Sequence, residues 1–163
     1  MKVYRLSKAK YVNDLSGIGA GLTGGRWNRK GTKLVYTADS RALCTAEIAV
    51  HTPIGITPSD YYLITIEIPD DIKIYSLDLE NLPDDWKGFP HSEKTQKIGE
   101  DFVSNREFLV MKVPSAVVQG DFNYLINPKH IDFGKIRIMG KEKFTFDERL
   151  FKRKSTGSQY IGN

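Results

Sequence analysis

Gly24-Gly25-Arg26-Trp27-Asn28 begins the most informative part of this sequence, which continues to residue 51. Arg26 follows two glycines, Tyr36 lies in an apolar run, and Glu47 lies on an otherwise apolar segment. A permanent cation, an aromatic ring and a carboxylate therefore occur within one short unit. We expect these three residues to form a small-molecule site, because the rest of the sequence offers little alternative chemistry.

The segment after this motif has the pattern of a strand followed by a helix. Residues 33–37 are predicted to form a strand, and Asp39 or Ser40 can cap a helix that ends near His51. On this helix Glu47 shares a stripe with apolar side chains at spacings of three and four residues. An unpaired buried carboxylate is costly, so Glu47 either pairs with a cation such as Arg26 or faces a cleft.

A glycine-rich segment, residues 17–25, precedes the motif. Its part Gly19-Ala20-Gly21-Leu22-Thr23-Gly24 matches the glycine fingerprint of dinucleotide-binding Rossmann folds. That fingerprint works only between a strand and a helix whose N-terminus receives the pyrophosphate. Polar residues precede this segment and Gly25-Arg26 follows it, so we reject the fingerprint and predict a tightly turning loop.

The rest of the chain predicts short strands and one further helix. A helix capped by Ser92 is expected to run to about residue 104 and to lie on a sheet. Strands are expected at residues 2–6, 61–68, 72–77, 108–113, 116–118, 124–126, 131–133 and 136–139, with 72–77 beside 61–68 after a turn. Hairpins replace a regular βαβ alternation, so we predict a single α+β domain of short antiparallel or mixed sheets with a few helices.

Length and composition predict one folded domain. Of the 163 residues, 40% are hydrophobic and 27% are charged, as in soluble globular proteins. The net charge of +4 comes from interspersed basic and acidic residues, which is not a nucleic-acid-binding pattern. No apolar run approaches the ~20 residues of a membrane helix, and the lone Cys44 suits a reducing compartment. We therefore expect a cytoplasmic protein with a domain at residues 1–153 and a flexible tail at 154–163.

Several common catalytic motifs are missing from the sequence. It has neither the paired cysteines nor the His-Glu-x-x-His spacing of a metal site, and no phosphate loop that ends in Gly-Lys-Ser or Gly-Lys-Thr. Ser115 does not lie in a Gly-x-Ser-x-Gly elbow, so a serine hydrolase has no support. We therefore expect no metal.

Five candidate residues have a structural as well as a functional interpretation. Trp27 is more typical of a core aromatic, and Tyr36 of a half-buried strand residue that remains eligible as a stacking platform. Ser115 and Asn127 each lie beside a proline, where a turn hydroxyl or a cap is common. His130 suits a structural role better than a catalytic one.

Taken in order, these motifs resemble the RES domain family, which is named for Arg, Glu and Ser. The resemblance rests on Gly24-Gly25-Arg26-Trp27-Asn28, Leu34-Val35-Tyr36-Thr37-Ala38, Ala46-Glu47, Pro114-Ser115 and Asn127-Pro128-Lys129-His130, and covers nearly the whole chain to about residue 150. It implies an ADP-ribosyltransferase-like fold and a toxin of a bacterial type II toxin–antitoxin system that consumes NAD. It also implies an Xre-type antitoxin with a helix-turn-helix as the partner.

The resemblance implies roles for the residues as well. Nicotinamide is already a cationic leaving group in NAD, so one carboxylate can suffice where ordinary glycosides need two. Glu47 would hold the ribose hydroxyls and stabilise the oxocarbenium-like transition state. Arg26 would pair with the pyrophosphate or the nicotinamide-side ribose, and Tyr36 would stack on nicotinamide. Ser115 would bond to the ligand or to Glu47, and the further candidates for substrate binding are Trp27, Asn28, Asn127 and His130.

The sequence leaves the acceptor of the ADP-ribose group open. Water would give hydrolysis, phosphate would give phosphorolysis, and a protein acceptor would make the chain an ADP-ribosyltransferase. A non-catalytic nucleotide-binding or antitoxin-binding module is the remaining alternative. We expect no direct nucleic-acid or membrane partner, and the sequence does not decide whether the chain forms a homo-oligomer.

Overall fold

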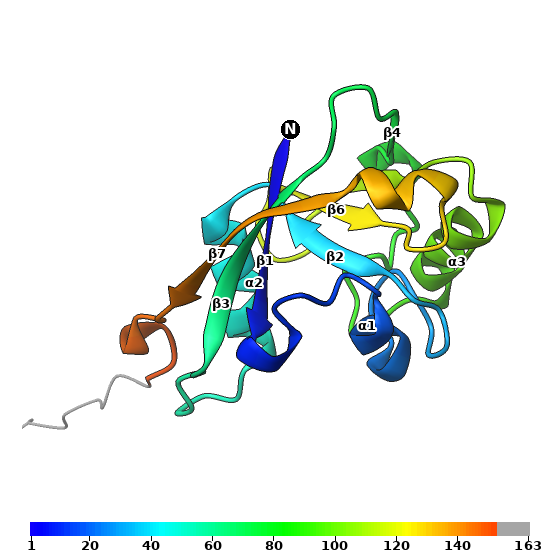
Figure 1. Ribbon diagram of the computed structural model, residues 1–163. Helices are drawn as coiled ribbons and strands as arrows, with labels where there is room; N and C mark the ends of the chain where they lie inside the picture. The colour runs from blue at the N-terminus through cyan, green and yellow to red at the C-terminus, as the bar shows by residue number, and fades with distance from the viewer. Residues whose placement is uncertain (153–163) are drawn as a thin grey trace, which may run out of the picture.

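One mixed sheet forms the centre of the protein (Figure 1). The computed structural model describes residues 1–152, so the expected tail at 154–163 lies outside the described residues. The seven strands lie in the order β4-β5-β6-β2-β1-β3-β7, and only β4 and β5 are parallel. Their bounds are β1 Lys2–Lys8, β2 Val35–Ala38, β3 Tyr61–Glu67, β4 Ile74–Ser76, β5 Val110–Pro114, β6 Phe122–Ile126 and β7 Arg137–Phe144. The predicted mixture of short, mostly antiparallel strands is confirmed.

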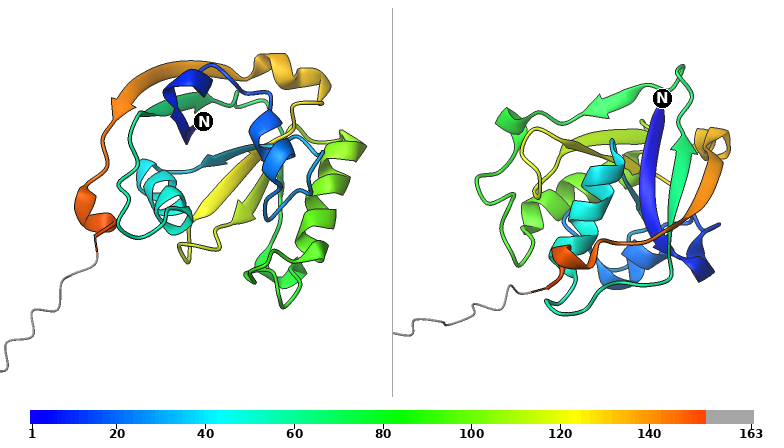
Figure 2. Two further views of the ribbon diagram at one scale, coloured as in Figure 1. Left: turned by 90° about the horizontal axis from the view of Figure 1, so that it is seen from below. Right: turned by 90° about the vertical axis from the view of Figure 1, so that its left-hand side faces the viewer.

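The sheet is nearly divided where β1 meets β2. β1 pairs with β3 along its whole length, from Lys2 opposite Glu67 to Lys8 opposite Tyr61. It pairs with β2 only at Tyr4, which lies opposite Ala38. The two strands therefore diverge from a single contact, and Figures 1 and 2 show β1 and β3 running across the direction of β2 and β6.

Three helices accompany the sheet, α1 Ile18–Thr23, α2 Arg41–His51 and α3 Glu93–Asn105. The Ser40 hydroxyl accepts a hydrogen bond from the Leu43 N–H, and the Ser92 hydroxyl accepts one from the Lys94 N–H. Both predicted caps are confirmed, because each hydroxyl satisfies an N–H group that the first helical turn leaves free. Four short 3₁₀ helices complete the fold: η1 Ala9–Tyr11, η2 Leu79–Asn81, η3 Ile131–Lys135 and η4 Glu148–Leu150.

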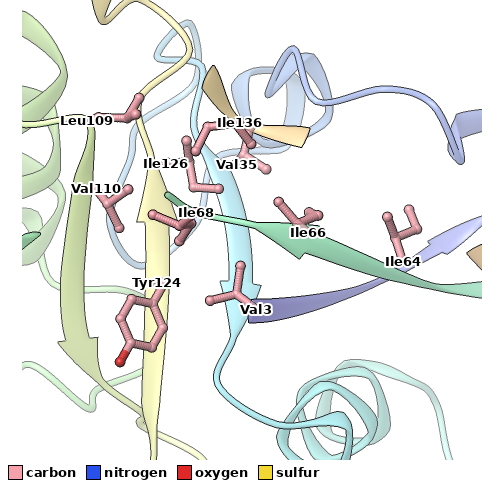
Figure 3. Packing of buried hydrophobic residues seen from close by; sticks show 10 residues of the cluster. All are labelled: Val3, Val35, Ile64, Ile66, Ile68, Leu109, Val110, Tyr124, Ile126 and Ile136. Atoms are coloured by element: carbon pink, nitrogen blue, oxygen red, sulfur yellow. The ribbon is translucent and has the colours of Figure 1, made fainter. Parts of the chain in front are cut away.

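Three groups of buried apolar side chains hold these elements together. Figure 3 shows the first, in which side chains of β1, β2, β3, β5 and β6 meet, among them Val3 and Val35. In the second, Phe102 and Val103 of α3 pack with Trp27 and with side chains of β5 and β6. The third joins α2 to β1, β3 and the segment that follows β7. The predicted placement of the helix at 92–104 on a sheet is thus confirmed.

Residues 72–77 do not pair with β3 as predicted. The strand there, β4, lies at the opposite edge of the sheet and is parallel to β5, with Ile74 opposite Val110. Both sides of β3 are already occupied, by β1 and by β7. The prediction was wrong because it paired neighbours in sequence, whereas β7 returns from the far end of the chain to take that place.

Two further short strands predicted from the sequence are absent from the described chain. Residues 116–118 form a bend, because the Ser115 hydroxyl accepts hydrogen bonds from the N–H groups of Val117 and Val118, which a strand would use for pairing. Residues 131–133 belong to η3, where His130 Nδ1 accepts a hydrogen bond from the Asp132 N–H. In both places a side-chain acceptor competes with the sheet for backbone donors.

The predicted loop at residues 17–25 contains the six-residue helix α1. Its glycines give it little intrinsic helix propensity, so local sequence argues against a helix there. Contacts from residues further along the chain stabilise it. The Asn28 side-chain amide donates to the Ala20 carbonyl, and the Gly31 N–H donates to the Gly21 carbonyl.

No helix within residues 1–152 is long and apolar enough to cross a membrane.

Replacing Gly99 with alanine should destabilise the protein, because α3 lies against the backbone of the Trp27 motif at this residue. A Cβ atom there would be 1.8 Å from the Trp27 carbonyl oxygen. This oxygen belongs to the backbone and cannot easily move away to relieve the clash. We expect Gly99→Ala to lower the free energy of unfolding by about 1–3 kcal/mol in a urea titration. Gly19→Ala, also in a helix but with no atom within 4 Å of the added Cβ, is the control. Equal stability of both variants would contradict this packing.

Candidate active site

A pocket of about 920 Å³ lies where β1 and β2 diverge. Its walls come from β1, β2, α1 and α2, together with residues of the loop before α3 and of the bend after β5. Arg26, Tyr36 and Glu47 all line it, so the three residues expected to form a site do share one cavity. Its volume lies within the range of pockets that bind small molecules and cofactors.

Glu47 projects from α2 into this pocket and is fixed by two side chains. Its Oε1 atom accepts a hydrogen bond of 2.8 Å from the Asn123 amide and one of 3.2 Å from the Ser115 hydroxyl. No cation lies within 4.0 Å of the carboxylate in the part of the chain that the structure describes. Of the two alternatives, pairing with Arg26 or facing a cleft, the structure shows the second.

Ser115 acts on the pocket through Glu47. Its hydroxyl donates to Glu47 and accepts from the Val117 and Val118 N–H groups, so the bend itself orients the donor. The side chain is buried and does not line the pocket. The predicted bond between Ser115 and Glu47 is confirmed, and this placement makes Ser115 a residue that positions the carboxylate.

Arg26 lines the pocket, and three of the five N–H groups of its guanidinium donate hydrogen bonds within the protein. It donates to three backbone carbonyls of one loop, those of Trp86, Lys87 and Gly88. Burial lowers the pKa of Arg26, and the Glu47 carboxylate acts in the opposite direction. Arg26 therefore holds the loop before α3 against the pocket, a role that the sequence did not indicate.

Tyr36 is the centre of a second network, which folds the glycine-rich motif onto β2. Its hydroxyl donates to Asn28 Oδ1 at 2.7 Å and accepts from the Trp27 N–H at 3.1 Å. Burial raises the pKa of Tyr36, so the phenol stays protonated and can keep donating. Gly25 is required here, because a Cβ atom on it would lie 2.8 Å from the Tyr36 hydroxyl. The close approach that Gly25 allows is therefore that of this tyrosine.

Trp27 and Asn28 make most of their contacts in the interior of the protein and few in the pocket. Trp27 is 2% exposed and packs in the core with Leu34 and Phe102, as a core aromatic should, although it also touches the pocket wall. Asn28 is fully buried and does not line the pocket. Its amide donates to the carbonyls of Ala20, Arg29 and Thr32, which leaves no free group for a substrate. The structure thus gives Asn28 a supporting role in place of the expected contact.

Asn127 and His130 lie outside the pocket. Asn127 is fully buried, and its amide donates to the Phe102 and Val103 carbonyls of α3. His130 caps η3 through Nδ1. The structure does not place either residue where it could touch a ligand in this pocket. It agrees with the structural interpretation of both residues.

The pocket residues that the sequence reasoning did not identify include Arg5, His91 and Asn123. Asn123 interrupts an apolar strand, and Arg5 lies in the interior of another between Tyr4 and Leu6, so a polar residue within a strand was the available signal. His91 Nδ1 is buried and has no hydrogen-bond partner among residues 1–152. Burial lowers the pKa of His91, and the charges of Arg26 and His51 lower it further, so His91 is neutral at pH 7.

Within residues 1–152 the structure shows neither a reactive thiolate nor a cluster of metal-binding side chains. Cys44 is free and buried, and burial raises the pKa of its thiol to about 12, so it is not a thiolate at neutral pH. Within residues 1–152 no group of three or more His, Cys, Asp or Glu side chains could hold a metal ion.

Comparison with known proteins assigns the chain that forms this pocket to a family. The sequence model of the RES domain matches residues 2–147. The chain belongs to the RES domain family. Arg26, Glu47 and Ser115, which the resemblance led us to expect as the family's Arg, Glu and Ser, lie in or beside the pocket.

Curated RES relatives match over nearly their whole length. The chain is 38% identical to the "Toxin Res" of Photorhabdus laumondii subsp. laumondii over 156 residues, which cover 94% of this chain and 99% of the relative. It is 37% identical to a "Prs ADP-ribosylating toxin" of Sphingobium sp. over 145 residues, which cover 87% of this chain and 89% of the relative.

The fold is also found in a solved structure. A chain from the crystal structure of the M. tuberculosis MbcT–MbcA toxin–antitoxin complex superposes with a TM-score of 0.71. The match covers 92% of this chain and 86% of that chain at 23% identity. The predicted α+β fold of the ADP-ribosyltransferase-like kind is confirmed.

Proposed function

We propose that this RES protein is the toxin of a bacterial toxin–antitoxin pair and that it cleaves the bond between nicotinamide and ribose in NAD. One observation supports this chemistry. The Glu47 carboxylate lines a pocket of about 920 Å³, is held there by hydrogen bonds from Ser115 and Asn123, and has no ion-pair partner in the described chain. The names of the relatives support a toxin and, in one case, the use of NAD as an ADP-ribose donor.

The arrangement of Glu47 suits an oxocarbenium-like transition state. Both hydrogen bonds to the carboxylate end on Oε1, and in the described chain Oε2 accepts none. Oε2 can therefore accept hydrogen bonds from the ribose hydroxyls, and the fixed negative charge stabilises the positive charge that develops on the sugar. No acid is needed, because nicotinamide departs as a neutral molecule from a cationic linkage.

The pocket offers a place for each part of NAD. The Tyr36 ring lines the wall beside Glu47, which suits stacking on nicotinamide. Arg26 lines the same pocket and contributes positive charge, while the loop carbonyls accept hydrogen bonds from three of its five N–H groups. The acceptor remains water, phosphate or a protein, and the relative named "Prs ADP-ribosylating toxin" favours keeping the protein transferase as the second candidate.

We further infer that the partner is an antitoxin of the Xre type with a helix-turn-helix. The shared fold with a chain of a toxin–antitoxin complex supports an antitoxin, and the family resemblance supports the Xre type. An extended segment that ends in a carboxylate would suit a pocket lined by two arginines, so inhibition by insertion into the cleft is the simplest mechanism.

Glu47→Gln should abolish most NAD cleavage. The amide keeps the size of the side chain but removes the charge that stabilises the transition state, so we expect kcat to fall by roughly 10²–10³-fold. Glu107→Gln, which removes an exposed carboxylate, should retain parental activity. Nicotinamide release is measured with purified protein and NAD, with and without inorganic phosphate.

The products of the same reaction separate the candidate functions. Free ADP-ribose indicates hydrolysis, ADP-ribose 1″-phosphate indicates phosphorolysis, and nicotinamide release that requires a cell extract indicates a protein acceptor. A folded Glu47→Gln variant that releases nicotinamide at the parental rate would refute the role of Glu47. Parental protein that binds NAD without releasing nicotinamide under any of these conditions would leave only the non-catalytic module.

Asn123→Ala should slow the reaction through Glu47. Loss of a hydrogen bond to a charged group costs about 1.5–3 kcal/mol, so we expect kcat to fall tenfold or more with little change in KM. The same substitution should have almost no further effect in a Glu47→Gln background, because the two residues act as one unit. Additive losses in the double variant would show that Asn123 acts independently of Glu47.

A reading frame beside this one should encode a helix-turn-helix protein. Mixed with the purified chain, that protein should form a complex that elutes as one species in size-exclusion chromatography and blocks nicotinamide release. Removing its last residues should restore activity if a terminal segment enters the cleft. A complex that forms but leaves the reaction rate unchanged would contradict inhibition at the pocket.

A further inference from the structure

The acceptor side of the proposed reaction involves a proton that Glu47 is not placed to take. Nicotinamide leaves as a neutral molecule, so its departure needs no acid. A water molecule or a hydroxyl group that attacks the ribose carbon, in contrast, loses its proton as the new bond forms. Oε2 of Glu47 is the oxygen left for the ribose hydroxyls, because both hydrogen bonds from the protein end on Oε1. A second group in the pocket that takes this proton would speed the attack.

Two histidines line the pocket and are the candidates for this base, His51 and His91. Histidine is the side chain that most readily accepts a proton near pH 7. Burial raises the pKa of Tyr36 and the pKa of the Cys44 thiol, so neither group is ionised at neutral pH. The two histidines differ in their surroundings, since His51 is exposed at the end of α2 and His91 is partly buried in the loop before α3.

His91 faces the pocket from a different element than Glu47 and belongs to the same group of charges. Glu47 and His51 are four residues apart on α2, so they lie on one face of the helix in successive turns. Burial lowers the pKa of His91, and the charges of Arg26 and His51 lower it further. Burial also lowers the pKa of Arg26, and Glu47 acts in the opposite direction. His91 therefore lies near both the Glu47 face of α2 and the cation beside it.

The ring of His91 has one buried and one accessible nitrogen. Nδ1 is buried and has no hydrogen-bond partner among residues 1–152. Nε2 makes no hydrogen bond within the same residues either, but it is not buried. The Phe89 ring meets the imidazole edge-on, with 5.5 Å between the ring centroids. A doubly protonated ring would have no acceptor for its Nδ1 proton and a cation nearby, so the neutral ring, with a lone pair available on Nε2, is the favoured form at pH 7.

On the basis of the proposed function, we propose that His91 is the general base that activates the acceptor of the ADP-ribose group. The bond between ribose C1″ and the nicotinamide nitrogen breaks, and its electron pair leaves with nicotinamide. An oxygen of water, or of a hydroxyl group on a protein acceptor, forms the new bond to C1″. The proton of that oxygen moves to Nε2 of His91, which later releases it to solvent. An anionic acceptor has no such proton to lose and does not need His91.

The test compares an acceptor that loses a proton with one that does not. Purified parental protein, His91→Gln and His91→Asn are incubated with NAD, with and without sodium azide, and ADP-ribose and ADP-ribosyl azide are quantified. Each amide replaces one ring nitrogen but cannot accept a proton at this pH. We expect hydrolysis to fall at least about tenfold in both variants, and formation of ADP-ribosyl azide to stay at the parental rate. Lys94→Gln, which removes an exposed charge from the first turn of α3, should match the parent with both acceptors.

The pH dependence of hydrolysis gives a second readout. His91 accepts a proton only while it is neutral, so parental hydrolysis should decline as the pH falls through the lowered pKa of His91. Between about pH 5 and pH 8 this decline should be absent from the residual hydrolysis of His91→Gln and from parental azide transfer. Declines of the same form in parental protein and His91→Gln would assign the titration to another group and contradict the inference.

Thermal unfolding separates catalysis from structure. Because His91 makes no hydrogen bond within residues 1–152, His91→Gln should melt at the parental temperature. A lower melting temperature, together with equal losses of hydrolysis and of azide transfer, would show that His91 supports the fold. Parental hydrolysis by a folded His91→Gln variant would overturn the inference directly.

Failure of the proposed function gives a different pattern. Parental protein that leaves NAD intact with water, phosphate, azide and cell extract would refute cleavage and the role of His91 together. Parental protein that cleaves NAD in a Glu47-dependent manner, with a His91→Gln variant of equal rate and equal pH profile, would refute the role of His91 alone.

Discussion

Glu47 carries a negative charge on the inner side of α2 without a cation to neutralise it in the described chain, and the surrounding structure answers this constraint. Glu47 is partly buried, and a charge withdrawn from bulk water is tolerated when hydrogen bonds replace those of water. Asn123 and Ser115 provide them. Asn123 is brought to Glu47 by the pairing of β6 with β2, and Ser115 by the bend that ends β5. The order of strands in the sheet therefore places a hydrogen-bond donor beside the carboxylate.

The pocket exists because the sheet does not close evenly. β1 and β2 share one pair of residues and then separate, and side chains of both strands, among them Arg5 and Tyr36, line a cavity there. Two networks keep it in shape. The hydroxyl of Tyr36 fastens the glycine-rich motif to β2, and Arg26 fastens the loop before α3. Both networks consist largely of hydrogen bonds to backbone groups, which fixes the walls and leaves Arg5, Glu47 and the Tyr36 ring facing the cavity.

Membership in the RES domain family and the fold shared with a chain of a toxin–antitoxin complex place this arrangement among related proteins. The structure changes how the family residues are interpreted. Of Arg26, Glu47 and Ser115, which we expected to be the residues of the family name, only Glu47 presents an uncommitted oxygen to the pocket. Ser115 hydrogen-bonds to Glu47, and Arg26 donates to three carbonyls of one loop. In the proposed function, chemistry therefore depends on one carboxylate, and the other two residues hold it and the pocket wall in place.

The sequence by itself determined the local features: the cap Ser92, a cap at Asp39 or Ser40, the helix that carries Glu47 toward the interior, and the strands 2–6, 61–68 and 124–126 to within a few residues. These follow from periodicity and from hydrogen bonds between residues a few positions apart. Only the tertiary structure decided that β7 takes the side of β3, that the N–H groups of Arg26 serve a loop 60 residues away, and that Arg5 and Asn123 reach the same cavity as Glu47. Polar side chains form hydrogen bonds with segments that are distant in sequence, and no local sequence pattern indicates which segment will lie beside them in the fold.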